Sequence, residues 1–344
     1  MQQDAMKKGV NLGGWISQFK DYDLHHFDTF ITRDDIKQIS AWGFDHVRLP
    51  VDYIVLEEKD RPGKFVDRGF DDISRCLDWC DEVGLRVILD LHKAPGYAFD
   101  EQGQNDFEIN PQKQDRFFQL WQAIAKRFSA VDQDKLAFEL LNEVVFEDAQ
   151  KWNNILQRAV TAIRSIDATR LILFGGNYWS AVDTLAELPE LSDQNILPKF
   201  HFYLPLSVTH QKAYWVQALL EYDQEIDYPG RADGLEEFLL KNPEFAWRLN
   251  DEVDAEFNET YLRKRLAPAV EFMRERRSAV HCGEFGVIDR APMPTRINWT
   301  RDMVKVLREY GIGYAYWTYK AMDFGLVDST GQVVSRELID ILAG

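Results

Sequence analysis

Short apolar runs alternate with longer amphipathic stretches along the 344-residue chain, and this alternation constrains the fold more than any other feature. Such runs, separated by helical patterns, are typical of parallel β-strands joined by α-helices. The expected strands cover residues 9–13, 46–50, 86–91, 136–142, 171–176, 196–203, 279–284 and 312–318. The expected helices include residues 32–41, 70–83, 112–128, 149–166, 262–276 and 300–310. Eight alternations in one chain predict an α/β protein with a (β/α)₈ TIM barrel.

Residues 204–261 interrupt this alternation, because a long segment stands where a short loop is expected after strand six. The segment is rich in aromatic residues, among them Tyr214, Trp215 and Trp247. We interpret residues 1–344 as a single barrel domain and residues 204–261 as an inserted subdomain. Active sites of these barrels form at the C-terminal ends of the strands, where the insertion begins. It is therefore expected to wall or cover the cleft, with a purely decorative insertion as the alternative.

The composition excludes several classes of partner. The chain has 40 basic and 57 acidic residues, a net charge of −17, so nucleic acids and anionic membranes are not expected partners. Three cysteines do not make a disulfide framework, and no apolar run reaches transmembrane length. The first residues lack the apolar core of a secretory signal, so we expect a cytoplasmic protein, or a secreted one whose signal is absent from this sequence. Nothing indicates an obligate oligomer, so a monomer is expected.

Two expected strands lead into a carboxylate. Strand 136–142 is followed by Glu143, and strand 279–284 ends at Glu284. The barrel fold brings both strand ends to one mouth. Two carboxyl groups about 5–5.5 Å apart are what retaining glycoside hydrolysis requires, since one attacks the sugar while the other protonates the leaving oxygen. The alternative is that carboxylates at strand ends bind a metal ion.

Polar or aromatic side chains mark the other expected strand ends. Arg48 lies in strand two, where its guanidinium can orient a carboxylate and keep it ionised. His92 follows strand three, and His201 and Tyr203 share one face of strand six. Trp317, in strand eight, offers a ring on which a sugar can stack. Such a set is hard to explain by packing alone and favours a carbohydrate cleft.

With these residues in place, the chain resembles glycoside hydrolase family 5, a family of retaining barrel enzymes. The motifs that carry the resemblance span nearly the whole chain. They are GVNLGGW at 9–15, WGFDHVRLP at 42–50, LNE at 141–143, HFY at 201–203, GEFG at 283–286 and YW at 316–317. More narrowly, the chain resembles the clostridial endoglucanase C type of this family, which shares NLGGWIS at 11–17, THQKA at 209–213 and an insertion after strand six.

The resemblance implies the roles of the residues that act on the cleaved bond. Glu143 would be the acid/base and Glu284 the nucleophile of a double displacement. Asn142 would hold the 2-hydroxyl of the sugar at the cleavage point, in a bond that strengthens toward the transition state. Arg48 and Tyr203 would flank Glu284.

The resemblance also implies the residues around the sugar. His201 would bond near the acid/base, His92 would contact the sugar, and Trp317 would form the stacking floor beneath it. Asn177, after strand five, would be a further sugar contact. Many relatives end strand three with two consecutive histidines, whereas this chain has Lys93 after His92. That second position, and its effect on sugar preference, is therefore left open.

The function implied is a retaining endo-β-1,4-glucanase of the cellulase type, acting on cellulose-type and mixed-linkage β-1,3-1,4-glucans without a metal or organic cofactor. β-Mannanase, xyloglucanase and β-1,3-glucanase activities use the same residues and stay open. Two other classes are alternatives. A non-enzymatic carbohydrate-binding barrel predicts loss of Glu143, Glu284 or Arg48, and all three are present. A metal-dependent lyase or isomerase predicts Asp, Glu and His ligands at successive strand ends, unlike the mixture found here.

Overall fold

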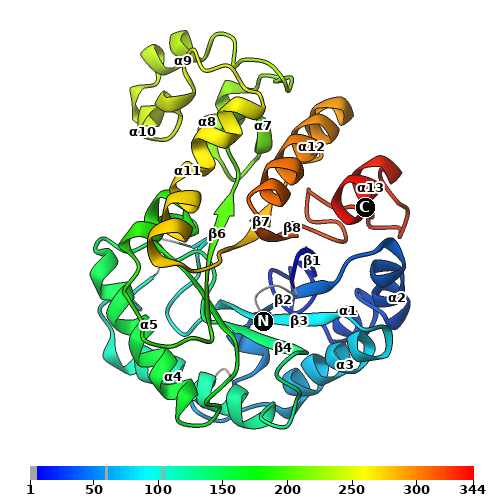
Figure 1. The fold of residues 1–344 in the computed structure, drawn as a ribbon, viewed down its shortest axis with the longest axis vertical. Helices are drawn as coiled ribbons and strands as arrows, with labels where there is room; N and C mark the ends of the chain where they lie inside the picture. Colours follow the sequence, from blue (N-terminus) through cyan, green and yellow to red (C-terminus); the bar gives the residue numbers. More distant parts are fainter. Residues whose placement is uncertain (1–5, 59–60, 102, 104) are drawn as a thin grey trace.

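The barrel predicted from the alternation is confirmed. The computed structural model describes residues 6–58, 61–101, 103 and 105–344, in which strands pair in parallel and in sequence order into a closed ring (Figure 1). The strands are β1 (Lys8–Asn11), β2 (His46–Asp52), β3 (Arg86–Lys93), β4 (Leu136–Glu139), β5 (Ile172–Gly175), β6 (Ile196–Phe202), β7 (His281–Phe285) and β8 (Gly313–Tyr316). Pairing of β1 with β8 closes the ring.

Helices between successive strands cover the outside of the ring (Figure 1). They are α1 (Leu24–Thr29), α2 (Arg33–Trp42), α3 (Asp67–Val83), α4 (Pro111–Arg127), α5 (Ala149–Arg164), α6 (Asn177–Ser180), α11 (Glu259–Arg276), α12 (Met293–Glu309) and α13 (Arg336–Ala343), with 3₁₀ turns η2 (Tyr53–Val55) and η4 (Val182–Glu187). In the part of the chain described, no helix combines the length and the apolar character needed to cross a bilayer.

The helix limits follow from local chemistry that the sequence already contains. Thr32 and Asp35 form a reciprocal capping box at the start of α2, in which the Asp35 carboxylate accepts the Thr32 N–H at 2.8 Å. Gly43 ends α2 at φ 102°, and Gly84 ends α3 at φ 74°, both in the left-handed region that favours glycine. These caps fix where each helix returns the chain to the barrel.

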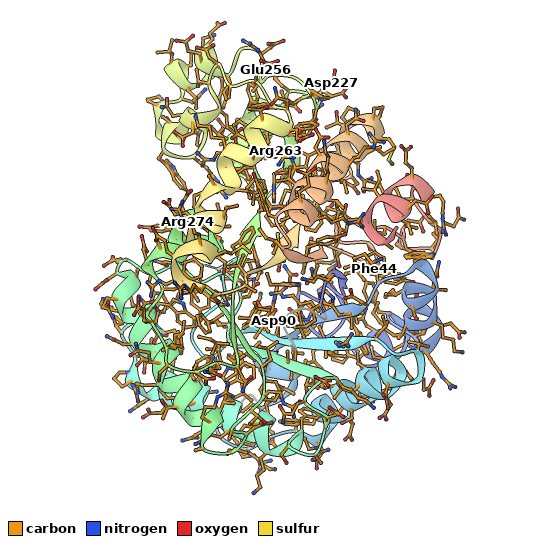
Figure 2. All side chains as sticks on the ribbon, viewed as in Figure 1. Phe44, Asp90, Asp227, Glu256, Arg263 and Arg274 are labelled. Atoms are coloured by element: carbon orange, nitrogen blue, oxygen red, sulfur yellow. The ribbon has the colours of Figure 1, made fainter. Side chains whose placement is uncertain are left out.

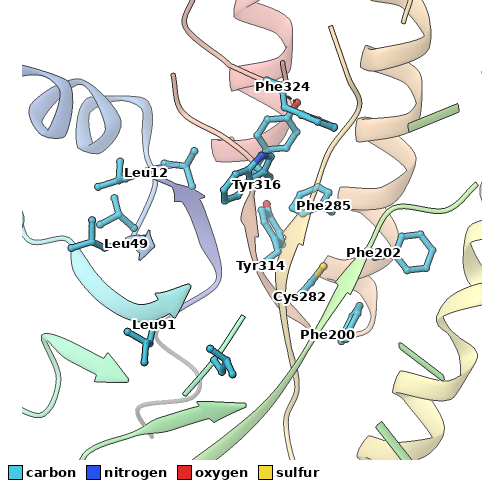
Figure 3. Close-up of a cluster of buried hydrophobic side chains, with 14 of the residues drawn as sticks. Leu12, Leu49, Leu91, Phe200, Phe202, Cys282, Phe285, Tyr314, Tyr316 and Phe324 are labelled. Atoms are coloured by element: carbon cyan, nitrogen blue, oxygen red, sulfur yellow. Dashed lines mark hydrogen bonds between the residues drawn. The ribbon is translucent and has the colours of Figure 1, made fainter. Parts of the chain in front are cut away.

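Alternation along the strands separates an apolar layer from a polar barrel interior. On β6, Phe200 and Phe202 belong to the hydrophobic core that Figure 3 shows around the strands, whereas Lys199 and His201 point inward and contact each other. On β3, Asp90 lies inside the ring, as Figure 2 shows. The interior near the catalytic end is therefore lined by charged and polar groups.

Five strands end earlier than the sequence predicts, among them β4 and β8. β4 stops at Glu139 and not at Asn142, and β8 stops at Tyr316, so that Trp317 lies just beyond it. The chain stays close to the barrel after β4, because the N–H of Asn142 donates to the carbonyl of Leu91 at 3.1 Å. Asn142 and Glu143 thus lie in the segment after β4, and Trp317 follows β8.

Residues 204–258 connect β6 to α11 and contain further short helices. These are α7 (Leu206–Thr209), α8 (Gln217–Tyr222), α9 (Leu235–Lys241) and α10 (Ala246–Leu249), with 3₁₀ turns η5 (Pro243–Phe245) and η6 (Asn250–Glu252). In Figure 1, α8, α9 and α10 lie beyond the rim of the barrel, at the top of the view. Leu204 anchors the start of the segment, because its carbonyl accepts the indole N–H of Trp299 at 3.1 Å. That this segment forms a subdomain stays a prediction.

Candidate active site

The two carboxylates predicted at the barrel mouth lie in one cleft. A side-chain ligand atom from each of Glu143, His201 and Glu284 lies within 4.8 Å of the others. Glu143 is 9% exposed and Glu284 is 5% exposed. Two carboxyl groups so close and so poorly hydrated interact strongly, because water does not screen their charges.

Glu284 is held at both oxygens. Nη1 of Arg48 donates to Oε1 at 2.7 Å, and the hydroxyl of Tyr203 donates to Oε2 at 3.0 Å. Both bonds restrain the carboxyl group, one from each side. Arg48 and Tyr203 therefore flank Glu284 and fix its orientation.

Glu143 has a different environment. Nδ1 of His201 lies 2.8 Å from its Oε1. Burial raises the pKa of Glu143 well above the ordinary range, and the negative charge of Glu284 raises it further. The two carboxyl groups thus have different environments, and Glu143 favours the protonated form that an acid requires.

Two buried polar atoms beside Trp317 and Arg48 have no hydrogen-bond partner within the described protein. Nδ1 of His92 bonds to Asp90 at 2.6 Å, and its ring stacks on Trp317 with centroids 5.8 Å apart. Among the described residues, Nε2 of His92 and Nδ2 of Asn142 are buried without a hydrogen-bond partner. Burial lowers the pKa of His92 to about 4, so its ring is neutral. Unpartnered buried polar atoms beside a flat ring are suited to sugar hydroxyls.

Glu143, His201 and Glu284 are also spaced closely enough to hold a metal ion. Their ligand atoms are already engaged, however, since Glu284 accepts from Arg48 and Tyr203 and Oε1 of Glu143 bonds to His201. A guanidinium in contact with Glu284 also opposes a cation there. The donor set is therefore poorly suited to a metal ion.

Comparison with known proteins identifies the family to which this chain belongs. The model of the family Cellulase (glycosyl hydrolase family 5) matches residues 4–323. The chain belongs to glycoside hydrolase family 5. It is therefore a glycoside hydrolase of the cellulase type, and the resemblance seen in its motifs is confirmed.

Individual family 5 relatives agree with this assignment. The chain is 43% identical over 339 residues to Endoglucanase C of Acetivibrio thermocellus, which covers 98% of both chains. It is 35% identical over 307 residues to Cellodextrinase A of Ruminococcus flavefaciens, covering 89% of this chain and 83% of the relative. The solved structure of endoglucanase Cel5A from Thermotoga maritima superposes with a TM-score of 0.80 at 24% identity, covering 99% of this chain and 98% of that one, and shows the same fold.

Two positions predicted from the family 5 motifs have contacts of their own. Asn177 is 2% exposed, and its amide exchanges hydrogen bonds with the main chain of Phe146 at 2.8 and 2.9 Å. The amide predicted to contact a sugar is thus occupied, and Asn177 positions the loop that follows Glu143. Nζ of Lys93 bonds to Asp100 at 2.8 Å, so its charge is paired at the cleft edge.

Sequence reasoning missed the buried charges beneath the family 5 site. Nη2 and Nε of Arg48 bond to the two carboxylate oxygens of Glu139 at 2.7 and 2.8 Å. Nζ of Lys199 lies 3.0 Å from the same carboxylate. Burial acts to raise the pKa of Glu139, but the charges of Arg48 and Lys199 outweigh it and lower that pKa to about 2. Spacing was the available signal, because Lys199 stands two residues before His201 on one strand face.

The 204–258 segment also approaches the site. The Arg248 guanidinium lies 5.5 Å from the ring centroid of Trp179 and 5.6 Å from that of Trp247. In the part of the chain that the structure describes, the Arg248 side chain makes no ion pair or hydrogen bond, and its positive charge acts to lower the pKa of Glu143. A cavity of about 370 Å³ is lined by Trp247, Arg248, Leu204 and Tyr261, among others. A cation in contact with two indole rings therefore lies close enough to Glu143 to affect its pKa.

Proposed function

We propose that this family 5 chain is a retaining endo-β-1,4-glucanase that hydrolyses cellulose-type and mixed-linkage β-1,3-1,4-glucans by double displacement. The observation that carries the proposal is the pair Glu143 and Glu284. Atoms of the two side chains lie within 4.8 Å of each other, whereas inverting enzymes keep their carboxyl groups about 6.5–9.5 Å apart to admit a water molecule. Their environments differ, because burial and the charge of Glu284 raise the pKa of Glu143, whereas Glu284 is bonded to Arg48 and Tyr203.

In the first step, Glu284 attacks the anomeric carbon while Glu143 gives its proton to the departing glycosidic oxygen. The C–O bond to the leaving sugar breaks, and an ester bond to Glu284 forms. The negative charge of Glu284 is then lost, so the pKa of Glu143 falls, because that charge is one of the causes that raise it. Glu143 can now accept a proton from water, which attacks the same carbon and restores Glu284.

The sugar at the cleavage point is bound by groups that the apo cleft leaves free. Nδ2 of Asn142 would donate to the 2-hydroxyl, Nε2 of His92 would bond to another hydroxyl, and Trp317 would stack beneath the ring. Trp247 and Arg248, from the 204–261 insertion, would wall the side on which the leaving chain departs. No metal or organic cofactor takes part, and a monomer carries the whole site.

The names of the relatives favour glucan over other polymers, since they include an endoglucanase and a cellodextrinase. Mannan is a second candidate, because a structure of the Thermotoga maritima neighbour is described in complex with mannotriose. Enzymes that hydrolyse xyloglucan or β-1,3-glucan use the same catalytic pair, and the sugar-binding subsites determine which polymer is accepted.

The test is hydrolysis of barley mixed-linkage glucan, carboxymethyl-cellulose, glucomannan, xyloglucan and laminarin, with and without EDTA. Product lengths and the anomer released first, observed by ¹H NMR, are recorded. The proposal expects mixed oligosaccharides from the first two polymers, an unchanged rate in EDTA, and the β-anomer as the initial product. An initial α-anomer would overturn the mechanism, activity on glucomannan or laminarin alone would overturn the substrate, and loss of activity in EDTA would overturn the metal-free chemistry.

A further inference from the structure

Lys199 is a buried cation in direct contact with the residue that supports Glu143. It lies on β6, two residues before His201, and its side chain is 0% exposed. Its Nζ lies 3.0 Å from Oε1 of Glu139 and 3.0 Å from Nε2 of His201. Lys199 does not reach the cleft surface, so it acts through His201 if it acts on the reaction.

Two glycines leave room for this contact. A Cβ at Gly175 would lie 2.9 Å from Cε of Lys199. A Cβ at Gly283 would lie 3.1 Å from Nε2 of His201 and 3.5 Å from Cδ of Lys199. The lysine stem therefore runs through a space that larger residues on β5 and β7 would narrow, and the ammonium has few alternative positions.

We propose that Lys199 is a positioning residue that fixes the tautomer of His201 and thereby places the catalytic proton of Glu143 on Oε2. The proposal rests on the acid/base role of Glu143 proposed above.

The argument begins with the donor inventory of the two side chains. An ammonium has N–H donors and no acceptor, and the ionised Glu139 beside it stabilises that charge. Nε2 of His201 must therefore offer its lone pair to Lys199. Burial, reinforced by the positive charge of Lys199, holds the pKa of His201 well below its ordinary value, so the ring is neutral and carries one proton. That proton is on Nδ1.

The tautomer decides which oxygen of Glu143 can carry a proton. Nδ1–H of His201 donates to Oε1 of Glu143 across 2.8 Å, so a proton on Oε1 would oppose that N–H. In the part of the chain described, Oε2 has no hydrogen-bond partner and is not among the fully buried unpaired atoms. The acid form of Glu143 is therefore protonated on Oε2, the oxygen left free for the leaving group.

The same arrangement serves both steps of the reaction. Transfer of the proton from Glu143 to His201 would create an imidazolium 3.0 Å from the Lys199 ammonium, which like-charge repulsion opposes. The proton consequently stays on Glu143 until the leaving oxygen takes it. In the second step Oε2 accepts a proton from water while His201 still donates to Oε1, so the histidine keeps one tautomer throughout.

The first experiment measures the tautomer directly in the wild-type protein. Two-bond ¹H–¹⁵N correlation spectra of ¹⁵N-histidine-labelled enzyme are recorded at neutral pH, with His201→Gln used to identify the signals of His201. The expected result is a protonated Nδ1 and an unprotonated Nε2. A protonated Nε2, or an imidazolium, would overturn the proposal. This measurement needs no activity, so it stands apart from the test of the proposed function.

The second experiment separates acid catalysis from a general loss of structure. In Lys199→Met, kcat/KM is expected to fall at least tenfold for phenyl β-cellobioside, whose poor leaving group needs a proton, and to stay within about twofold for 2,4-dinitrophenyl β-cellobioside, whose leaving group does not. Lys199→Arg, which keeps a donor, should restore much of the loss. Lys135→Met, at an exposed lysine paired with Asp81, is the matched control and should leave both rates unchanged.

Equal losses on both aryl cellobiosides, or no loss on either, would overturn the role of Lys199. The proposed function fails in a different way, when Glu143→Gln hydrolyses phenyl β-cellobioside at the wild-type rate. That result would leave the tautomer measurement intact, so the two failures are distinguishable.

Discussion

Arg48 and Glu139 form a bidentate ion pair inside the barrel, with Nη2 2.7 Å from Oε1, Nε 2.8 Å from Oε2, and both side chains fully buried. The remaining nitrogen, Nη1, bonds to Glu284 at 2.7 Å. The pair therefore orients the guanidinium that holds Glu284, the proposed nucleophile. Buried ion pairs of the barrel and the residues proposed to act on substrate belong to one network.

The first prediction concerns the stability of this network. Glu139→Gln should lower the free energy of unfolding by about 3 kcal/mol at neutral pH, because buried Lys199 loses the carboxylate paired with it, whereas Arg48 keeps its contacts with Glu284 and Asp90. The pKa of Glu139 is lowered to about 2, so its stabilising contribution is complete above the unfolded value near 4.5 and is lost as pH falls through about 2. The difference in free energy of unfolding between variant and wild type, measured with urea, should therefore shrink over that pH range. Glu190→Gln, at an exposed ion pair with Arg276, should change stability by less than about 0.5 kcal/mol.

The nucleophile gives the second prediction. Glu284→Ala should lose several orders of magnitude in turnover, because the covalent route disappears. Added azide should restore part of the rate with an activated aryl β-cellobioside and give the α-glycosyl azide, identified by ¹H NMR. A variant that kept more than about a tenth of the wild-type rate, a loss under roughly 1.4 kcal/mol, would disprove the assignment. Glu271→Ala, on the exposed side of α11, is the control.

The third prediction follows from the coupling of the two carboxyl groups. In the proposed mechanism Glu143 is protonated for the first step, so kcat/KM should fall as pH rises through its pKa. Burial and the charge of Glu284 raise that pKa, so this fall should occur at a higher pH than for an ordinary glutamate. In Glu284→Gln the charge is gone, so the pKa of Glu143 should fall. Titration of the ¹³C-labelled Glu143 carboxyl in both proteins measures this. An unchanged or higher pKa in the variant would contradict the coupling.

The fourth prediction concerns Asn142. Its Oδ1 accepts from Nη2 of Arg48 at 2.9 Å, which turns the unpartnered Nδ2 away from the guanidinium. Asn142→Ala should lower kcat/KM for an aryl β-cellobioside by roughly tenfold or more, since a bond to the 2-hydroxyl strengthens toward the transition state. The loss should nearly vanish with the matching 2-deoxy substrate. Equal losses on both substrates would show that Asn142 acts by another route.

The fifth prediction concerns the insertion. Arg248→Ala should lower kcat/KM for cellopentaose and cellohexaose severalfold but leave an aryl β-cellobioside nearly unaffected, because the aryl substrate has no sugar on the leaving side. Arg274→Ala, an exposed arginine on the outside of α11, should affect neither substrate. If Arg248→Ala impaired both substrates alike, the insertion would not form a binding site for the leaving chain.

That Glu143 and Glu284 lie close together was predictable, because the fold itself dictates where strand ends meet. Once eight strand–helix alternations are recognised, both residues are expected at one mouth of the barrel, and so is Arg48 on β2. The helix caps at Thr32 and Gly84 were predictable for a different reason, since they depend on contacts a few residues apart in sequence.

The buried charges were not predictable in the same way. Glu139 and Lys199 stand within apolar runs on β4 and β6, and their pairing depends on how strands distant in sequence approach across the barrel. A sequence shows that such a charge is buried but not which partner neutralises it. The bonds of Asn177 to the main chain of Phe146 were not predictable for a related reason, because Phe146 lies on another loop.

The position of the insertion on β6 limits how the enzyme can be redesigned. Tyr203, whose hydroxyl donates to Glu284, is the last residue before the segment begins, and its carbonyl accepts the hydroxyl of Thr209 at 2.6 Å. A chimera that exchanges the segment between relatives should therefore join after Thr209 and not at the end of the strand. A cut six residues earlier would exchange the support of Tyr203 along with the wall of the cleft, and a change of substrate would then be inseparable from damage to the chemistry.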